Sequence, residues 1–191
     1  MPRSKTPFRA FHPLVFFVIF LLLFFSVAHR LSVRAPFAPS QRVVDKNEYA
    51  DIAVVYVYDG DTIKLENGER VRFLGIDTPE SSENKKLFRD AARSGQDIKE
   101  ILAMGHAAAV YTKSLLDGRR VRLEFDIEKR DKYGRLLAYI YRVDDGLFIN
   151  EDIIKNGYAY PMTIPPNIRH ADEFRKLFHE AQKAKRGLWS S

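Results

Sequence analysis

The chain has 191 residues, 46% of them hydrophobic, which is enough for one domain with a sizeable core and for additional segments. It contains no cysteine, so disulfide bonds and thiolate metal sites are excluded. The net charge of +6 comes mostly from residues 1–30, which carry four basic residues and no acidic one, leaving 27 of the 31 basic residues against 25 acidic ones. Total charge therefore does not indicate a nucleic-acid partner, and any basic surface must be local.

The N-terminal part contains an uncharged apolar run at residues 13–28, preceded by the basic residues 1–12. Its length lies between that of a signal-peptide core and that of a bilayer-spanning helix. Two interpretations of residues 13–30 therefore stay open. A transmembrane anchor would hold the protein on the membrane, and a signal peptide cleaved after Ala28 would release it. A buried core helix is disfavoured, because the run is apolar on all sides.

In either case the basic residues 1–12 should stay in the cytoplasm and direct the rest of the chain outward. The sequence thus predicts a domain outside the cytoplasm, either anchored by a single N-terminal helix or secreted after cleavage. Residues 31–48, which include Pro36 and Pro39, are expected to form a linker. Residues 49–191 are expected to form the folded domain, as a monomer.

Five segments of this domain have the composition typical of strands. Asn67-Gly68 lies between two of them and is the strongest short-range signal for a hairpin with a two-residue turn, in which both turn residues need a positive φ. The predicted strands are residues 52–58, 62–66, 69–75, 120–128 and 136–142.

Helical pieces are expected at residues 85–93 and 97–104, and helices at residues 106–116, 149–155 and about 171–185. Asn150 is a possible helix cap, and His106 is expected to start a helix or to pack. Trp189 and the helically spaced Phe174 and Phe178 are expected to belong to the core. The predicted fold class is α+β: a five-stranded OB-fold barrel with about three helices, preceded by an N-terminal hydrophobic helix.

The predicted hairpin would bring Asp61 close to the segment that carries Asp77, Thr78 and Glu80. The two aspartates and the Thr78 carbonyl offer an incomplete all-oxygen shell, which suits Ca²⁺ better than Zn²⁺. Glu80 is placed to orient or deprotonate an attacking water. The alternative is that residues 59–61 form a plain turn and residues 77–80 a helix start.

Two arginines in the predicted strands and turns, Arg72 and Arg135, could neutralise the charge that develops on a phosphodiester, because a guanidinium pairs with two oxygens at once. Lys132 and Tyr133 could contact a terminal phosphate and a base or sugar. The alternatives are ordinary surface arginines and an ordinary hairpin tip.

In these motifs the chain resembles the staphylococcal nuclease (thermonuclease) family over nearly all of residues 50–190. The matching pieces are DGDT at 59–62, VRFLGIDTPE at 71–80, GHAAAVYTKSLL at 105–116, EKRDKYGRLLAYIY at 128–141, INEDIIKNGYA at 149–159 and RGLWS at 186–190.

The resemblance implies a Ca²⁺-dependent endonuclease that hydrolyses phosphodiester bonds of DNA and RNA to 3′-phosphate products. Three residues, Asp61, Asp77 and Thr78, would hold the metal. The implied catalytic residues are Arg72, Glu80 and Arg135, and the implied substrate-binding residues are Lys132 and Tyr133.

Two departures from the family pattern are visible. The segment 81–104 is longer than the usual loop and could cover the cleft, and residues 162–164 replace a tyrosine pair, which weakens base stacking from that side. Two other functions stay open: a catalytically silent OB-fold module that binds nucleic acid or protein at the membrane, and a structural membrane-tethered domain.

Overall fold

The computed structural model of the protein describes residues 47–190. The predicted hydrophobic helix at residues 13–30 and most of the predicted linker lie outside the described residues. Among the residues that are described, none of the helices has the length and apolar character that crossing a bilayer requires.

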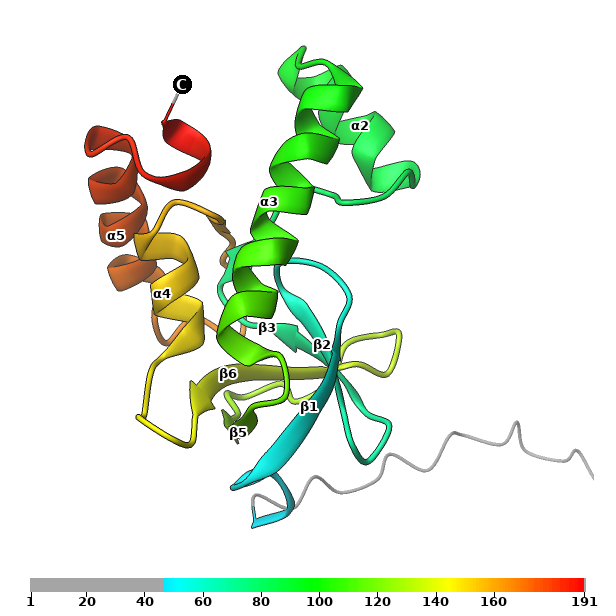
Figure 1. The fold of residues 1–191 in the computed structure, drawn as a ribbon, viewed down its shortest axis with the longest axis vertical. Coiled ribbons are helices and arrows are strands. Elements are labelled where there is room, and N and C mark those ends of the chain that lie inside the picture. Colours follow the sequence, from blue (N-terminus) through cyan, green and yellow to red (C-terminus); the bar gives the residue numbers. More distant parts are fainter. Residues whose placement is uncertain (1–46, 191) are drawn as a thin grey trace, which may run out of the picture. The chain divides into compact units, whose positions relative to one another are not determined.

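Five strands close into a barrel with the order β1-β2-β3-β6-β5 (Figure 1). All neighbouring strands are antiparallel except β3 and β6, which pair in parallel, so the barrel is mixed. This confirms the predicted five-stranded barrel, although β5 ends at Glu124 rather than at residue 128. The strands are β1 Ile52–Val57, β2 Thr62–Leu65, β3 Arg70–Phe73, β5 Arg120–Glu124 and β6 Leu136–Arg142.

A second, two-stranded sheet was not expected from the sequence. It pairs β4 Ile76–Asp77 with β7 Tyr160–Pro161 in an antiparallel register. Strands of two residues carry too little pattern to be recognised in a sequence. This pairing matters for the site, because it fixes the segment that carries Asp77.

The described residues form four α-helices, where about three were predicted: α2 Lys85–Ser94, α3 Ile98–Leu116, α4 Ile149–Lys155 and α5 Ala171–Lys183. The two expected pieces at residues 97–104 and 106–116 are one continuous helix, α3. Gly105 lies within α3 and does not interrupt it. Its missing side chain lets α3 pack directly on the backbone of Glu80, because a Cβ at residue 105 would lie 2.2 Å from the Glu80 carbonyl oxygen. Figure 1 shows α2 beside the first half of α3 and α4 beside α5.

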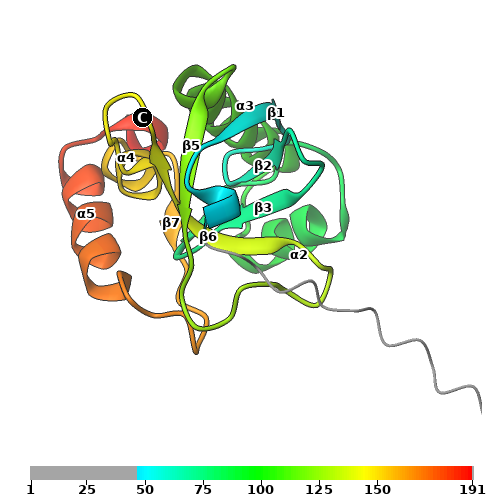
Figure 2. The same ribbon diagram turned by 90° about the horizontal axis from the view of Figure 1, so that it is seen from below.

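The barrel core is filled by inward-facing side chains of alternating strand positions, as the two-residue period requires. Ile63 and Leu65 of β2 and Val71 and Phe73 of β3 are buried, while Arg70 on the other face of β3 is exposed. Seen from below in Figure 2, the short 3₁₀ helix Asn47–Tyr49 lies at one end of the barrel. Tyr49 there is 1% exposed and contacts Phe125 edge to face.

The hairpin between β2 and β3 forms as predicted, but its turn differs. The Gly68 N–H donates to the Leu65 carbonyl at 2.9 Å, and only Gly68 in this turn has a positive φ, of 87°. The connection is therefore a three-residue loop, Glu66 to Gly68, with a glycine bulge, rather than a two-residue turn.

Two expectations about helices were wrong. Asn150 does not cap α4: its buried amide accepts from the Ile140 N–H at 2.9 Å and donates to the Leu74 carbonyl at 2.8 Å, and so connects β6 to the end of β3. His106 neither starts a helix nor packs, because it is exposed in the middle of α3. The core assignment of Phe174 is confirmed, whereas Phe178 and Trp189 are only partly buried and contact each other edge to face.

Candidate active site

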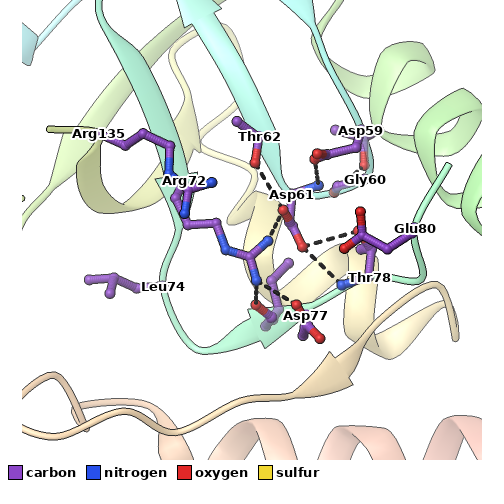
Figure 3. Close-up of polar contacts among 12 residues, drawn as sticks. Asp59, Gly60, Asp61, Thr62, Arg72, Leu74, Asp77, Thr78, Glu80 and Arg135 are labelled. Atoms are coloured by element: carbon purple, nitrogen blue, oxygen red, sulfur yellow. Dashed lines mark hydrogen bonds and ion pairs between the residues drawn. The ribbon is translucent and has the colours of Figure 1, made fainter. Parts of the chain in front are cut away.

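All eight predicted site residues line one cavity of about 640 Å³. One side of this cavity comes from the β2–β3 hairpin and the loop that follows it, and the other side from the turn before β6. Figure 3 shows Arg135 extending toward Arg72 from the side away from the acidic residues. The eight residues are Asp61, Arg72, Asp77, Thr78, Glu80, Lys132, Tyr133 and Arg135.

Asp61 directly precedes β2 and is 2% exposed. One carboxylate oxygen accepts from the Thr78 backbone N–H at 2.9 Å and from its hydroxyl at 3.0 Å (Figure 3). The other oxygen accepts from the Thr62 hydroxyl at 3.0 Å and pairs with Arg72. A buried carboxylate needs such partners, since an unpaired buried charge is very costly. Asp61 is therefore held in one orientation.

The position of the Asp61 turn depends on α3. The Thr112 hydroxyl, buried in α3, donates to the Gly60 carbonyl at 2.7 Å. Asp59 accepts from the Asp61 N–H at 3.1 Å, so residues 59–61 do form a turn, as the alternative interpretation held. The turn also lines the cavity, and burial raises the pKa of Asp59 despite the nearby Arg72. The turn formed by residues 59–61 is therefore itself part of the site.

Arg72 connects the two predicted metal-binding aspartates. It lies opposite Thr62 in the hairpin register, which directs its side chain to the outer face of the barrel. Its guanidinium pairs with Asp61 and, at 2.6 Å, with Asp77, and it donates to the Ile76 carbonyl at 3.3 Å (Figure 3). The planar group thus spans both carboxylates, as charge-assisted pairing favours.

Residues 77–80 do not start a helix, because α2 begins only at Lys85, with Asn84 as its N-cap. The alternative interpretation of this motif was therefore wrong. Asn84 also donates to the Glu80 carboxylate, at 2.5 Å. Glu80 is thereby positioned at the edge of the cavity by the cap residue of the following helix.

Lys86 belongs to the same cluster, although the sequence did not single it out. Its ammonium lies 2.7 Å from Glu80, 3.1 Å from Asp77 and 3.5 Å from the Thr78 carbonyl. Burial lowers the pKa of Lys86, but its acidic neighbours more than offset this, and the net pKa is raised. Its neighbour Lys85 is exposed. Sequence offered no signal to tell the two lysines apart, because the difference depends on which side of α2 faces the cavity.

The donors that would hold a metal are all oxygens, as a hard cation requires. No group of three or more histidine, cysteine or acidic side chains is arranged to hold a metal in the part of the chain that is described. A calcium ion would therefore use the Asp61 and Asp77 carboxylates, the Thr78 carbonyl and further oxygens from water or substrate. The ammonium of Lys86 contacts two of these three groups, the Asp77 carboxylate and the Thr78 carbonyl.

Arg135 is placed by Asp131, another residue that sequence reasoning missed. The Asp131 carboxylate accepts from the Arg135 backbone N–H at 2.9 Å and from its Nε at 2.8 Å. This leaves the terminal nitrogens of the guanidinium available to the cavity. Tyr133 is 74% exposed, and the ammonium of Lys132 lies 5.1 Å from its ring.

Two further expectations concern the walls of the cavity. Met162 and Ile164 line it, and the weaker base stacking expected on that side stays a prediction. Within the segment 81–104, which was expected to cover the cleft, Lys86 lines the cavity. Whether this segment restricts substrate stays a prediction.

Comparison with known proteins points to the same chemistry. The family model of staphylococcal nuclease homologues matches residues 70–191. The thermonuclease of Staphylococcus intermedius is 35% identical over 157 residues, which are 81% of this chain and 83% of that protein. Two Bacillus subtilis proteins also match: SPbeta prophage-derived endonuclease YokF, 35% identical over 148 residues, and endonuclease YncB, 33% identical over 151 residues.

Coverage differs among these relatives. The match includes 75% of this chain but only 45% of YokF, and 76% of this chain and 64% of YncB. The chain therefore spans about half to two thirds of these two proteins and most of the thermonuclease. The family match covers more than half of the chain, including every predicted site residue except Asp61. The chain belongs to the staphylococcal nuclease family, a family of phosphodiesterases.

Proposed function

We propose that this thermonuclease-family phosphodiesterase is a Ca²⁺-dependent endonuclease that cleaves DNA and RNA outside the cytoplasm and leaves 3′-phosphate ends. The observation that supports this most strongly is that three acidic side chains and two arginines, from segments about 60 residues apart in sequence, line one cavity. The family relationship and the endonuclease names of two relatives support the reaction class.

In this proposal Asp61, Asp77 and the Thr78 carbonyl hold Ca²⁺. The ion would stabilise negative charge on the phosphate and help to supply the attacking water. Arg72 already spans both aspartates, so it lies where it can also pair with a phosphate oxygen next to the metal. Arg135, oriented by Asp131, would approach the phosphate from the opposite side of the cavity.

Glu80 would act as the general base. Its carboxylate takes the proton from the water as the water oxygen bonds to phosphorus, and the bond from phosphorus to the 5′ oxygen breaks. The departing oxygen takes up a proton from solvent, and the phosphate stays on the 3′ side. The hydrogen bond from Asn84 and the contact with Lys86 hold Glu80 in place for this step. Lys132 and Tyr133 would contact the nucleotide beside the scissile phosphate.

The test measures plasmid DNA and RNA digestion by the protein with Ca²⁺ and with a chelator. We expect Glu80→Gln and Arg135→Ala to reduce kcat by about a thousandfold, because each removes a contact made in the transition state. Arg175→Ala is the control, since this arginine is 54% exposed on α5 and is not part of the cavity. Equal digestion by all variants would place the chemistry elsewhere.

The main alternative is a catalytically silent OB-fold module that binds nucleic acid or protein at the membrane. It predicts oligonucleotide binding without Ca²⁺-dependent cleavage, so the same assay separates the two. Location outside the cytoplasm is inferred from residues 1–30 alone. Mass spectrometry of the N-terminus of the mature protein would distinguish a retained anchor from a cleaved leader, and detection of the domain in the cytoplasm would contradict both.

A further inference from the structure

Four side chains form a second feature on the outer face of the barrel, next to the cavity but not part of the chemistry described above. They are Tyr56 of β1, Tyr58 directly after β1, Lys64 of β2 and Arg70 of β3, and are called here the outer strip. Inward-facing neighbours in the same strands, such as Ile63 and Val71, are fully buried. The outer strip therefore lies on the solvent side of the sheet.

A β-bulge places the aromatic part of the outer strip. Val54 pairs with Leu65 and Tyr56 pairs with Lys64, so Val55 is an extra residue in β1. Without it, Tyr56 would face the core like Val54, two residues earlier. The bulge turns Tyr56 outward, and the residue is 56% exposed. Exposing a large aromatic side chain in this way has no benefit for the core.

The strand register aligns the outer strip with the cavity. Tyr56 lies opposite Lys64, and Lys64 lies opposite Arg70. Arg70 and Arg135 directly precede Val71 and Leu136, which pair in parallel, so the row continues toward Arg135. Arg72 follows Arg70 by two residues on the same face, about 7 Å further along the strand. The row is thus a direct continuation of the surface that carries the two arginines of the site.

The two cationic residues of the outer strip differ from the arginines of the site in their partners among residues 47–190. Neither Lys64 nor Arg70 forms an ion pair with any described residue, unlike Arg72, Arg130 and Arg135. The Arg70 guanidinium lies 4.6 Å above the centre of the Tyr58 ring. The Tyr56 and Tyr58 rings meet edge to face at 4.9 Å. The contact with Tyr58 supports Tyr56 from one side, while more than half of the Tyr56 surface stays exposed.

We infer that the outer strip binds a single-stranded stretch of nucleic acid flanking the scissile phosphate. A base would stack on Tyr56, and the neighbouring phosphates would pair with Arg70 and Lys64, in the combination of aromatic and cationic groups that single strands favour. A duplex is disfavoured as the occupant, because stacking needs the face of an unpaired base. This inference rests on the proposed function only where it places the single strand next to a scissile phosphate. Binding of the strand to the outer strip does not depend on cleavage.

The first experiment measures binding without cleavage, by fluorescence anisotropy of a labelled thymidine oligomer of about 20 nucleotides in chelator. We expect Tyr56→Ala to weaken binding about tenfold or more and Tyr56→Phe to leave it nearly unchanged, because stacking needs the ring and not the hydroxyl. Lys64→Ala and Arg70→Ala should each reduce the slope of log K against log salt by about 0.7.

The control is Lys113→Ala, which removes an exposed lysine on α3 that has no ion pair among the described residues. Unchanged affinity and salt slope in all variants of the outer strip would overturn the inference, as would an equal loss in Lys113→Ala. Thermal unfolding of each variant excludes misfolding as the cause of weaker binding.

A second measurement separates this inference from the proposed function. With Ca²⁺, variants of the outer strip should lose kcat/KM on the oligomer about tenfold relative to a thymidine dinucleotide, which is too short to reach Tyr56. If wild type cleaves both substrates and the variants lose both equally, the outer strip is not a separate subsite. If wild type cleaves neither substrate but the binding results hold, the nuclease proposal fails and the binding surface stands.

Discussion

Replacing Lys86 with methionine tests how the acidic cluster is neutralised. The ammonium of Lys86 lies 2.7 Å from Glu80 and 3.1 Å from Asp77. In the proposed function Asp77 also binds Ca²⁺, so the ammonium and the ion would compete for this carboxylate. Methionine keeps much of the length of the side chain but removes its charge. The variant should therefore be less stable without metal and should bind Ca²⁺ more tightly, two effects that no simple misfolding would combine.

The magnitudes follow from the two contacts. The Lys86 side chain is 31% exposed, so each contact contributes about 1 kcal/mol, at the upper end for partly exposed pairs. Losing both should lower the unfolding temperature by about 4–8 °C for a domain of this size. Removing the competing Lys86 ammonium, whose two contacts contribute about 2 kcal/mol, should tighten Ca²⁺ binding by about 10- to 30-fold.

Isothermal titration calorimetry with Ca²⁺ and thermal unfolding in chelator give the two quantities directly. Lys85→Met is the matched control, because the neighbouring lysine is exposed and does not line the cavity. If Lys86→Met and Lys85→Met bind Ca²⁺ equally well, then the ammonium does not compete with the metal, and our view of the cluster is wrong.

Three further predictions concern structure. Gly105→Ala should lower stability by about 1–3 kcal/mol and reduce nuclease activity, because its Cβ would lie 2.2 Å from the Glu80 carbonyl oxygen; a more stable variant, as helix propensity alone suggests, would refute this. Asn150→Leu should cost about 2–5 kcal/mol in urea unfolding, since two buried backbone groups lose their partner, and a loss below 1 kcal/mol would show that water replaces the amide. Arg142 lowers the pKa of Asp145 to about 2. This pair therefore stabilises the fold fully above the ordinary aspartate pKa near 4, and the stabilisation is lost as the pH falls through about 2. Asp145→Asn should flatten the dependence of stability on pH in that range, and an unchanged pH profile of acid unfolding would contradict the pairing.

The barrel and its hairpin could be predicted because their signals are local. Alternation along β2 and β3 and the Asn67-Gly68 pair are visible in a short window of sequence. The turn type was wrong because Asn-Gly also fits a three-residue loop, in which only Gly68 takes a positive φ. Hydrogen bonding across the strands selects between the two, and this depends on register rather than on the two residues alone.

The helices were harder to predict where a glycine has a tertiary role. Gly105 was expected between two helical pieces, yet its function is a close contact with the Glu80 backbone. Similarly, Asn150 has the side chain of a helix cap but bonds to two other elements. In both residues the local preference was overridden by a contact with a residue distant in sequence, which the sequence pattern does not contain.

In the site, the residues with distinctive chemistry could be identified from the sequence, but the residues that hold them in position could not. The acids and arginines stand out in the motifs, and the structure places them around one cavity. Lys86, Asn84 and Asp131 hold Asp77, Glu80 and Arg135 in position, but each is a common surface residue type. Their roles depend on which helix face or turn side meets the cavity, and this is set only when the barrel and α2 are packed together.

The parallel pairing of β3 with β6 also determines when the cavity is complete. Val71 and Leu136 pair there, so the hairpin and the segment before β6 can meet only after the intervening helices and β5 have been synthesised. A nascent chain that ends before residue 135 lacks Arg135 and cannot form the complete site. If the protein is exported before it folds, the producing cell's own nucleic acids would be protected until the polypeptide has left the cytoplasm.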